Sequence, residues 1–273
     1  MAEIRLSRAV LREIEKVVEV AGYLWERDWA EANGGNVSLN LSDAIPDPPG
    51  DLSSFRYVPA AGFPPAAAEK VFFATGAGVR LRDLARPEEG GCVLAFDREA
   101  KGYFLLWGGR GNAEFRATSE LMSHVLVHLD KESAGSGHRA VLHTHPLELL
   151  CLTHHPRYGA DEKALNTVLW SMFPEVRVYL PRGIGVVPYI LPGSRELAER
   201  TVEVLRSRDV ALWGKHGAVA SGRDIQEAFD YLHVANKGAK ALLQCLSIGF
   251  TPLGLTGEEL AELAGVFRLE SLT

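Results

Sequence analysis

The chain has 273 residues, 47% hydrophobic and 23% charged, a composition typical of a globular protein with a substantial core. The net charge of −6 argues against a nucleic-acid-binding surface as the main function, because such surfaces are usually basic. No apolar run approaches the roughly 20 residues of a membrane-spanning helix, and the N-terminus lacks a signal-peptide pattern. The three cysteines are widely spaced in apolar segments, so we expect reduced thiols and a cytoplasmic protein.

The first half of the chain predicts one long helix followed by several strands. Apolar residues recur at helical spacing over 7–31, and the two glycines of ANGGN (32–36) should end that helix in a turn. Polar residues and prolines over 43–54 predict an exposed loop. Strands are predicted at NVSLNL (36–41), in KVFFATGAGVR (70–80) before its glycines, and as a hairpin at CVLAFD (92–97) and YFLLWG (103–108).

The second half predicts alternating helices and strands. A helix should start in TSELMSHVLVHLDK (118–131), where Thr118 or Ser119 can cap the first amides. The other predicted helices are 146–152, 194–208, 224–245 and 258–267, and the other predicted strands are RAVLHTH (139–145), EVRVYLP (175–181) and two within DVALWGKHGAVASG (209–222). No repeat or linker divides the chain, so the pattern predicts one α/β domain over residues 1–273.

Two histidines in VLHTHP (141–146) are candidate metal ligands. His143 and His145 are two residues apart, so on a strand both side chains would point to the same side. On the spacing alone, two structural histidines at a strand end are the better explanation. A third histidine, His216, lies in a glycine-containing turn after VALW (210–213), and three imidazoles would suit a catalytic zinc or a similar ion.

Glu120 is a candidate acid or base, because it lies in the first turn of the predicted helix at 118–131. The same position also suits an acid that merely stabilises the helix dipole, so its function depends on whether it faces the histidines. Three short turns, NGGN (33–36), TGAG (75–78) and Thr118–Ser119, expose amides and small polar groups that can hold a phosphate. None of them matches a Walker or dinucleotide-binding fingerprint.

The ordered segments GGNVSL, ATGAG, TSELMSH, VLHTHP and KHG resemble the class II, metal-dependent sugar-phosphate aldolase family over nearly the whole chain. Within that family the chain looks most like the branch that acts on L-rhamnulose 1-phosphate. This narrower resemblance depends on the chain length and on WERDWAEANGGN (25–36), GYFLLWG (102–108) and LPRGIGVVPYILPGS (180–194).

The resemblance implies a single α/β domain with a central, mainly antiparallel sheet and helices on both faces. It implies one Zn²⁺ per subunit, a homotetramer with active sites at subunit interfaces, and reversible cleavage to dihydroxyacetone phosphate and L-lactaldehyde in rhamnose breakdown. Carried over residue by residue, the zinc ligands would be His143, His145 and His216, the catalytic glutamate would be Glu120, and the phosphate site would be Asn33, Gly35, Asn36, Gly76, Thr118 and Ser119.

The chain departs from the family pattern in two places. Ala77 stands where the family often has a serine, so one hydroxyl contact to phosphate is absent, although a backbone amide can replace it. Ser171 stands where a glutamate from a neighbouring subunit is used in the enterobacterial pattern, and Glu175 is the nearest acid that could take that part. We see no lysine suited to a Schiff base, because Lys215 is better explained as a solvated turn residue.

Three alternatives remain open on the sequence alone. L-Fuculose-phosphate aldolase and L-ribulose-5-phosphate 4-epimerase share the three histidines, but they are typically shorter chains. The extended insertions here, at 43–65 and in the hairpin at 92–108, favour the rhamnulose branch. A non-catalytic adducin-like domain has the same fold, but it would not need the histidines together with the glutamate.

Overall fold

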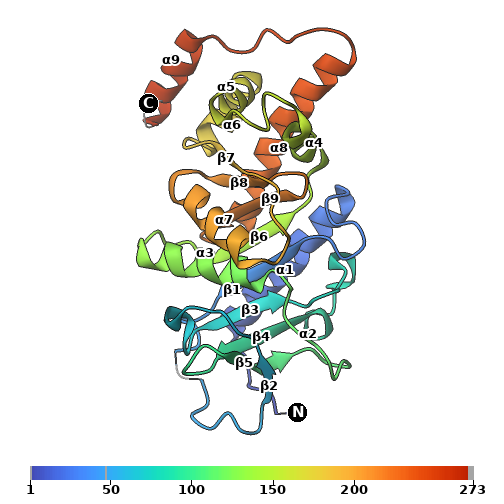
Figure 1. Cartoon of the computed structure of the whole chain (residues 1–273), viewed down its shortest axis with the longest axis vertical. Helices are drawn as coiled ribbons and strands as arrows, with labels where there is room; N and C mark the ends of the chain where they lie inside the picture. Colours follow the sequence, from blue (N-terminus) through green and yellow to red (C-terminus); the bar gives the residue numbers. More distant parts are fainter. Residues whose placement is uncertain (1, 47, 270–273) are drawn as a thin grey trace.

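One nine-stranded sheet organises the chain in the computed structural model, which describes residues 2–46 and 48–269 (Figure 1). The strand order is β2-β5-β4-β3-β1-β6-β9-β8-β7, and every neighbouring pair is antiparallel except β7 with β8. The strands are β1 (Asn36–Asn40), β2 (Arg56–Pro59), β3 (Val71–Thr75), β4 (Gly91–Phe96), β5 (Gly102–Gly108), β6 (Ala140–Thr144), β7 (Ile184–Val187), β8 (Val210–Trp213) and β9 (Gly217–Gly222).

Helices cover both faces of this sheet. The α-helices are α1 (Arg8–Glu26), α2 (Pro87–Gly90), α3 (Leu121–Ser133), α4 (Leu147–His154), α5 (Glu162–Met172), α6 (Pro174–Tyr179), α7 (Arg195–Ser207), α8 (Ile225–Ser247) and α9 (Gly257–Phe267), and two short 3-10 turns lie at Pro65–Ala67 and Leu81–Asp83. In Figure 1 the green helix α3 and the orange helix α7 lie side by side across the middle of the sheet. The expected α/β fold with a mainly antiparallel sheet is therefore confirmed.

Strand β6 shows how the alternation of side chains builds the two cores. Ala140 and Leu142 are fully buried in the core that α1 and α8 complete. Val141 points to the opposite face and packs with Val127 of α3 and Leu205 of α7. Because neighbouring side chains on a strand alternate between faces, His143 follows Val141 onto the α3 side of the sheet.

Most predicted elements are confirmed within a few residues, and the first helix ends earlier than predicted, at Glu26. The strand predicted at 175–181 is wrong, because Pro174–Tyr179 forms helix α6. Pro174 stands at the first helical position, where its fixed φ favours a helix, and Val176 is buried in the same core as α8. Strands β2 and β7 and helix α5 were not predicted from the sequence.

No helix in the described ranges is long and apolar enough to cross a membrane. One domain over residues 1–273 stays a prediction, because residues 1, 47 and 270–273 lie outside the described residues.

Leu142 should be a main determinant of stability, because it is fully buried in the central strand β6. We expect Leu142→Ala to lower the free energy of unfolding by about 2–5 kcal/mol, through lost burial and the cavity that remains. Leu253→Ala is the control, because Leu253 is 96% exposed. Equal denaturation midpoints in urea for the two variants would contradict this assignment of the core.

Candidate metal centre and active site

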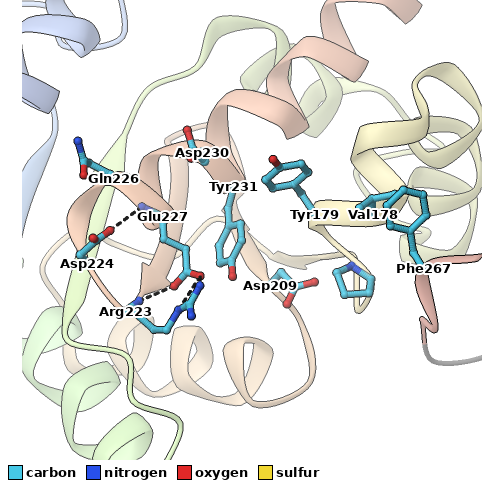
Figure 2. A pocket seen from close by; sticks show the side chains of 11 residues that line it. Val178, Tyr179, Asp209, Arg223, Asp224, Gln226, Glu227, Asp230, Tyr231 and Phe267 are labelled. Carbon is cyan, nitrogen blue, oxygen red and sulfur yellow. Dashed lines mark hydrogen bonds and ion pairs between the residues drawn. The ribbon is translucent and has the colours of Figure 1, made fainter.

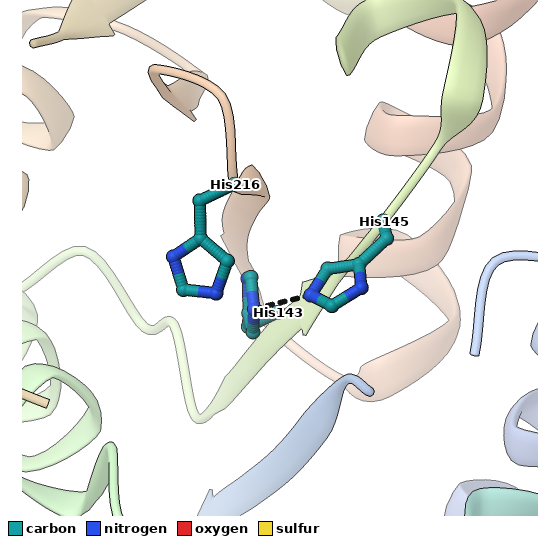
Figure 3. Close-up of side chains that lie close together, drawn as sticks. All are labelled: His143, His145 and His216. Carbon is teal, nitrogen blue, oxygen red and sulfur yellow. Dashed lines mark hydrogen bonds between the residues drawn. The ribbon is translucent and has the colours of Figure 1, made fainter. Parts of the chain in front are cut away.

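Three histidines converge where β6 and the β8–β9 turn meet. His143 lies on β6, His145 follows immediately after that strand, and His216 lies in the tight turn between Trp213 and Gly217. One ring nitrogen from each lies within 4.8 Å of the others (Figure 3). The pairing of strand β6 with β9 brings His216 next to His143 and His145.

Hydrogen bonds at Nδ1 fix the position of that proton in two of these rings. His143 Nδ1 donates to the Ala218 carbonyl at 3.1 Å, and His145 Nδ1 donates to the Glu31 carboxylate at 2.6 Å. Both partners only accept hydrogen bonds, so Nδ1 holds a proton in each ring and Nε2 is the nitrogen that can bind a metal. The two Nε2 atoms face one another at 3.2 Å, an arrangement that a shared cation would stabilise.

This donor set fits a zinc ion. Two nitrogens that share a tetrahedral zinc at about 2.05 Å lie roughly 3.3 Å apart, close to the separation observed between His143 and His145. Burial lowers the pKa of His143 well below its ordinary value and that of His216 to about 4, so both rings are neutral ligands at pH 7. His216 Nδ1 is a buried atom with no hydrogen-bond partner among the described residues.

Glycine makes room for the imidazoles at two points. A Cβ at Gly217 would lie 2.8 Å from His145 Cδ2 and 2.9 Å from His143 Cε1. A Cβ at Gly34 would lie 2.9 Å from the His145 ring. Distances under about 3 Å are steric clashes, so the glycines of the NGGN and KHG segments allow the histidines to close on one another.

Glu120 faces the histidines from the start of α3. Its carboxylate lies 3.5 Å from His143 Nε2 and 3.5 Å from His216 Nε2, and it is only 5% exposed. Burial raises the pKa of Glu120, and a hydrogen bond of 2.8 Å that Asn36 Nδ2 donates to Oε2 opposes that rise. Glu120 occupies the N-cap position of α3 but makes no capping hydrogen bond, so its carboxylate is directed to the cluster instead.

The three turns predicted from the sequence lie together beside Glu120. Thr75 accepts from the Thr118 amide through its carbonyl at 2.8 Å, and its hydroxyl accepts from the Val37 amide at 3.1 Å. Gly76 pairs with Ala117 in an isolated bridge, and a Cβ at Gly76 would collide with the ring of Phe115 at 2.5 Å. The segments 35–37, 75–76 and 117–120 thus form one surface next to the histidines.

The predicted phosphate-site residues differ in how available they are. Asn33 and Ser119 are exposed, whereas Thr118 is buried and accepts from the Glu120 amide. Both ends of the buried Asn36 carboxamide are engaged, because Oδ1 accepts from His124 Nε2 at 2.5 Å while Nδ2 holds Glu120. Glu175 is an exposed residue in the first turn of α6.

Sequence reasoning missed Glu31 and His124. Glu31 precedes the NGGN turn and is 59% exposed at its side chain, so only its contact with His145 Nδ1 marks it as part of the site. His124 is one helical turn after Glu120, and that spacing of four residues is the feature that could have indicated it.

A separate cavity of about 680 Å³ lies between α6, α8 and α9 (Figure 2). Several of its charged side chains already have partners: Arg223 pairs with Glu227 at 2.7 Å, and Asp224 caps α8. Asp209, also at its edge, pairs with Arg182 at 2.8 Å. The cavity therefore offers fewer free polar groups than the histidine cluster, which is the better candidate site.

The sequence model of the class II aldolase and adducin N-terminal domain family matches residues 15–243. The chain belongs to this family. The matched range contains Glu120 and all three histidines of the cluster.

Individual members of the class II aldolase family share most of their length with this chain. The rhamnulose-1-phosphate aldolase of Bacteroides thetaiotaomicron is 39% identical over 263 residues, which cover 96% of each chain. The enzyme of the same name from Escherichia fergusonii is 31% identical over 95% of this chain and 94% of its own. The crystal structure of a sugar-phosphate aldolase from Thermotoga maritima matches with a TM-score of 0.72 and 32% identity, over 90% of this chain and all of that one.

Metal content should depend on His145. We expect the purified wild type to hold close to one divalent ion per chain and His145→Ala to lose most of it, because one of three ligands is removed. His154→Ala, which changes an exposed histidine at the end of α4, is the matched control. Elemental analysis after dialysis makes the measurement, and full metal retention by His145→Ala would refute the assigned ligand set.

Proposed function

We propose that this chain is a zinc-dependent aldolase that reversibly cleaves L-rhamnulose 1-phosphate to dihydroxyacetone phosphate and L-lactaldehyde. The observation that carries the proposal is the contact of the Glu120 carboxylate with two of three convergent imidazoles. The choice of substrate is supported by the rhamnulose-1-phosphate aldolase of B. thetaiotaomicron, which is similar over 96% of both chains.

Zinc held by His143, His145 and His216 would supply a Lewis acid that stabilises negative charge on the oxygens of the ketone fragment. In the synthetic direction Glu120 removes a proton from the hydroxymethyl carbon of dihydroxyacetone phosphate, and in the cleavage direction it returns one. Because Asn36 occupies Oε2, the oxygen available for this transfer is Oε1. The raised pKa of Glu120 makes it a stronger base than an exposed glutamate, which favours proton removal.

The phosphate would lie on the surface formed by the three turns. Gly35 and Gly76 allow close approach of the backbone, and Thr118 and Ser119 add hydroxyl groups beside Glu120. Asn33 is exposed at the outer edge of the first turn and can reach an anion there. A phosphate at this place fixes which carbon of the ketone faces Glu120, which is the main contribution of such turns to the rate.

We also propose the homotetramer that the family resemblance implies and the cytoplasmic location that the cysteine pattern predicts. The three cysteines are free thiols, as expected of a protein in a reducing compartment. Tyr189 and Leu191 are exposed apolar side chains on the segment after β7, which adjoins the turn that carries His216, and they suit burial against another subunit. Glu175 is the candidate for an acid donated by a neighbouring subunit.

Two aldol-type alternatives use the same cluster. L-Fuculose 1-phosphate aldolase has the same fold, with a TM-score of 0.61 over 94% of this chain, but at 17% identity the likeness concerns the fold alone. An L-ribulose-5-phosphate 4-epimerase would need different acid and base groups around the same histidines. An adducin-like interaction domain is disfavoured, because such a domain does not require Glu120 together with the three histidines.

Glu120→Gln should separate metal binding from turnover. The variant keeps the shape of the side chain and the three ligands but loses the base, so we expect unchanged metal content and a fall in kcat of roughly a hundredfold to ten-thousandfold. Glu132→Gln, an exposed acid near the end of the same helix, is the control. The proposed role of Glu120 is wrong if Glu120→Gln cleaves the substrate at the wild-type rate.

The substrate itself is tested by offering the purified enzyme L-rhamnulose 1-phosphate, L-fuculose 1-phosphate and L-ribulose 5-phosphate. We expect the highest kcat/KM on the rhamnulose ester. Release of dihydroxyacetone phosphate is the readout for the two 1-phosphates, and inversion of configuration at C4 is the readout for L-ribulose 5-phosphate. A preference for either of the other two esters would move the chain to another branch of the family, and inactivity of the metal-loaded enzyme on all three would support a non-catalytic function.

A further inference from the structure

The buried polar groups behind Glu120 form one continuous chain of hydrogen bonds. Asn36 Nδ2 donates to Glu120 Oε2 at 2.8 Å, and Asn36 Oδ1 lies 2.5 Å from His124 Nε2. Ser38 Oγ then lies 2.7 Å from His124 Nδ1 and 2.8 Å from His128 Nε2. All five side chains are at most 9% exposed, so the chain runs through the interior between β1 and α3.

The spacing of the two elements explains why these groups alternate so regularly. Glu120, His124 and His128 recur every four residues along α3 and its N-cap, a rise of about 6 Å. Asn36 and Ser38 recur every two residues along β1, a rise of about 6.6 Å. Since the two rises nearly match, each strand side chain fits between two helix side chains. His128 ends the series by stacking on Phe72 of β3, with ring centroids 5.4 Å apart.

One end of this chain determines the direction of every hydrogen bond in it. A general base is ionised before it takes a proton, and an ionised carboxylate only accepts, so Asn36 must turn its NH₂ group to Glu120. Asn36 Oδ1 is then an acceptor, and His124 must carry its proton on Nε2. The remaining nitrogen, His124 Nδ1, accepts from the Ser38 hydroxyl, which accepts in turn from His128 Nε2.

Both buried imidazoles suit this arrangement, because each must be neutral with a single proton. Burial lowers the pKa of His124 to about 3 and that of His128 to about 3, so neither ring carries a charge at pH 7. A neutral ring with its proton on Nε2 offers one donor and one acceptor, which matches the two contacts of His124.

We infer that His124, Ser38 and His128 are positioning residues, whose donor chain locks the Asn36 carboxamide in the orientation that holds Glu120 Oε2 and directs Oε1 to the substrate. The inference rests on the proposed function of Glu120 as the base. If the His124 donor is lost, rotation of the Asn36 amide by 180° is no longer opposed, and Oδ1 would then face the carboxylate and repel it. This series of hydrogen bonds from His128 to Asn36, called the relay below, passes no proton to Glu120. It therefore affects proton transfer by positioning Glu120, and not substrate binding or the metal ligands.

Ser38→Ala tests the relay with the smallest change in volume. We expect kcat to fall about tenfold, since one link of a buried chain is removed, while KM and metal content stay at the wild-type values. His124→Phe, which removes both ring nitrogens, should lower kcat by roughly ten- to a hundredfold. Exchange of the carbon-bound proton of dihydroxyacetone phosphate with D₂O, followed by NMR, should fall by the same factor, because it isolates the step that Glu120 performs.

Two control variants separate positioning from general destabilisation. Ser221→Ala removes another buried serine hydroxyl, on the same row of the sheet as Ser38. That hydroxyl contacts the ring of His138 and not the hydrogen bonds behind Glu120, so the variant should leave kcat unchanged. Ser38→Thr keeps the hydroxyl, and a strand favours β-branched residues, so this variant should retain most of the wild-type activity. The inference is overturned if Ser38→Ala and His124→Phe retain wild-type exchange rates, or if Ser221→Ala lowers the rate as much as Ser38→Ala does.

Crystal structures of the wild type, of Ser38→Ala and of His124→Phe keep this test independent of the substrate assignment. We expect the contact between Asn36 and Glu120 Oε2 to be lost or rearranged in each variant, with the three histidines unmoved. An unchanged contact in both Ser38→Ala and His124→Phe refutes the relay. A wild type that neither exchanges nor cleaves refutes the proposed function instead, and the relay is then judged on these structures alone.

Discussion

The register in which β1 pairs with β6 is the constraint on which the site depends. It sets Asn36 opposite His143 and Ser38 opposite Val141, so all four side chains point to the α3 side of the sheet. Val37 and Leu39 point the other way into the core under α1 and α8. A slip of one residue would bury Asn36 and Ser38 among those apolar side chains, a change that the unmet hydrogen bonds make very unfavourable.

Burial acts on His143, His216 and Glu120 in the direction of neutrality. It lowers the pKa values of His143 and His216 and raises that of Glu120. These two histidines thereby become ligands that need not lose a proton at pH 7, and the glutamate becomes a stronger base. A bound divalent ion would place positive charge beside the Glu120 carboxylate. Because opposite charges attract, it would favour the ionised form of Glu120.

The parts of the fold that follow from local periodicity could be predicted from the sequence. The helix at 118–131 and the strand at 139–145 have clear patterns, and glycines mark the turns at 33–36 and 215–217. The helix at Pro174–Tyr179 was mistaken for a strand because a short apolar segment fits both periods, and burial against α8 decided between them. The contacts of Asn36 with Glu120 and His124 could not be predicted, since they join residues more than 80 positions apart through the pairing of β1 within the sheet.

The carboxamide of Asn36 also separates Glu120 from the hydroxyl and imidazole groups of Ser38, His124 and His128. Hydroxyl and imidazole groups can pass protons along a chain, but an amide N–H is not released at neutral pH, although it donates a hydrogen bond. The buried histidines of α3 are thus isolated from Glu120 as proton acceptors, however close they lie. A proton that Glu120 takes from carbon therefore leaves through Oε1, to the same carbon, to a substrate oxygen or to bulk water. The isotopic fate of that hydrogen is consequently governed by how often water reaches a single carboxylate oxygen.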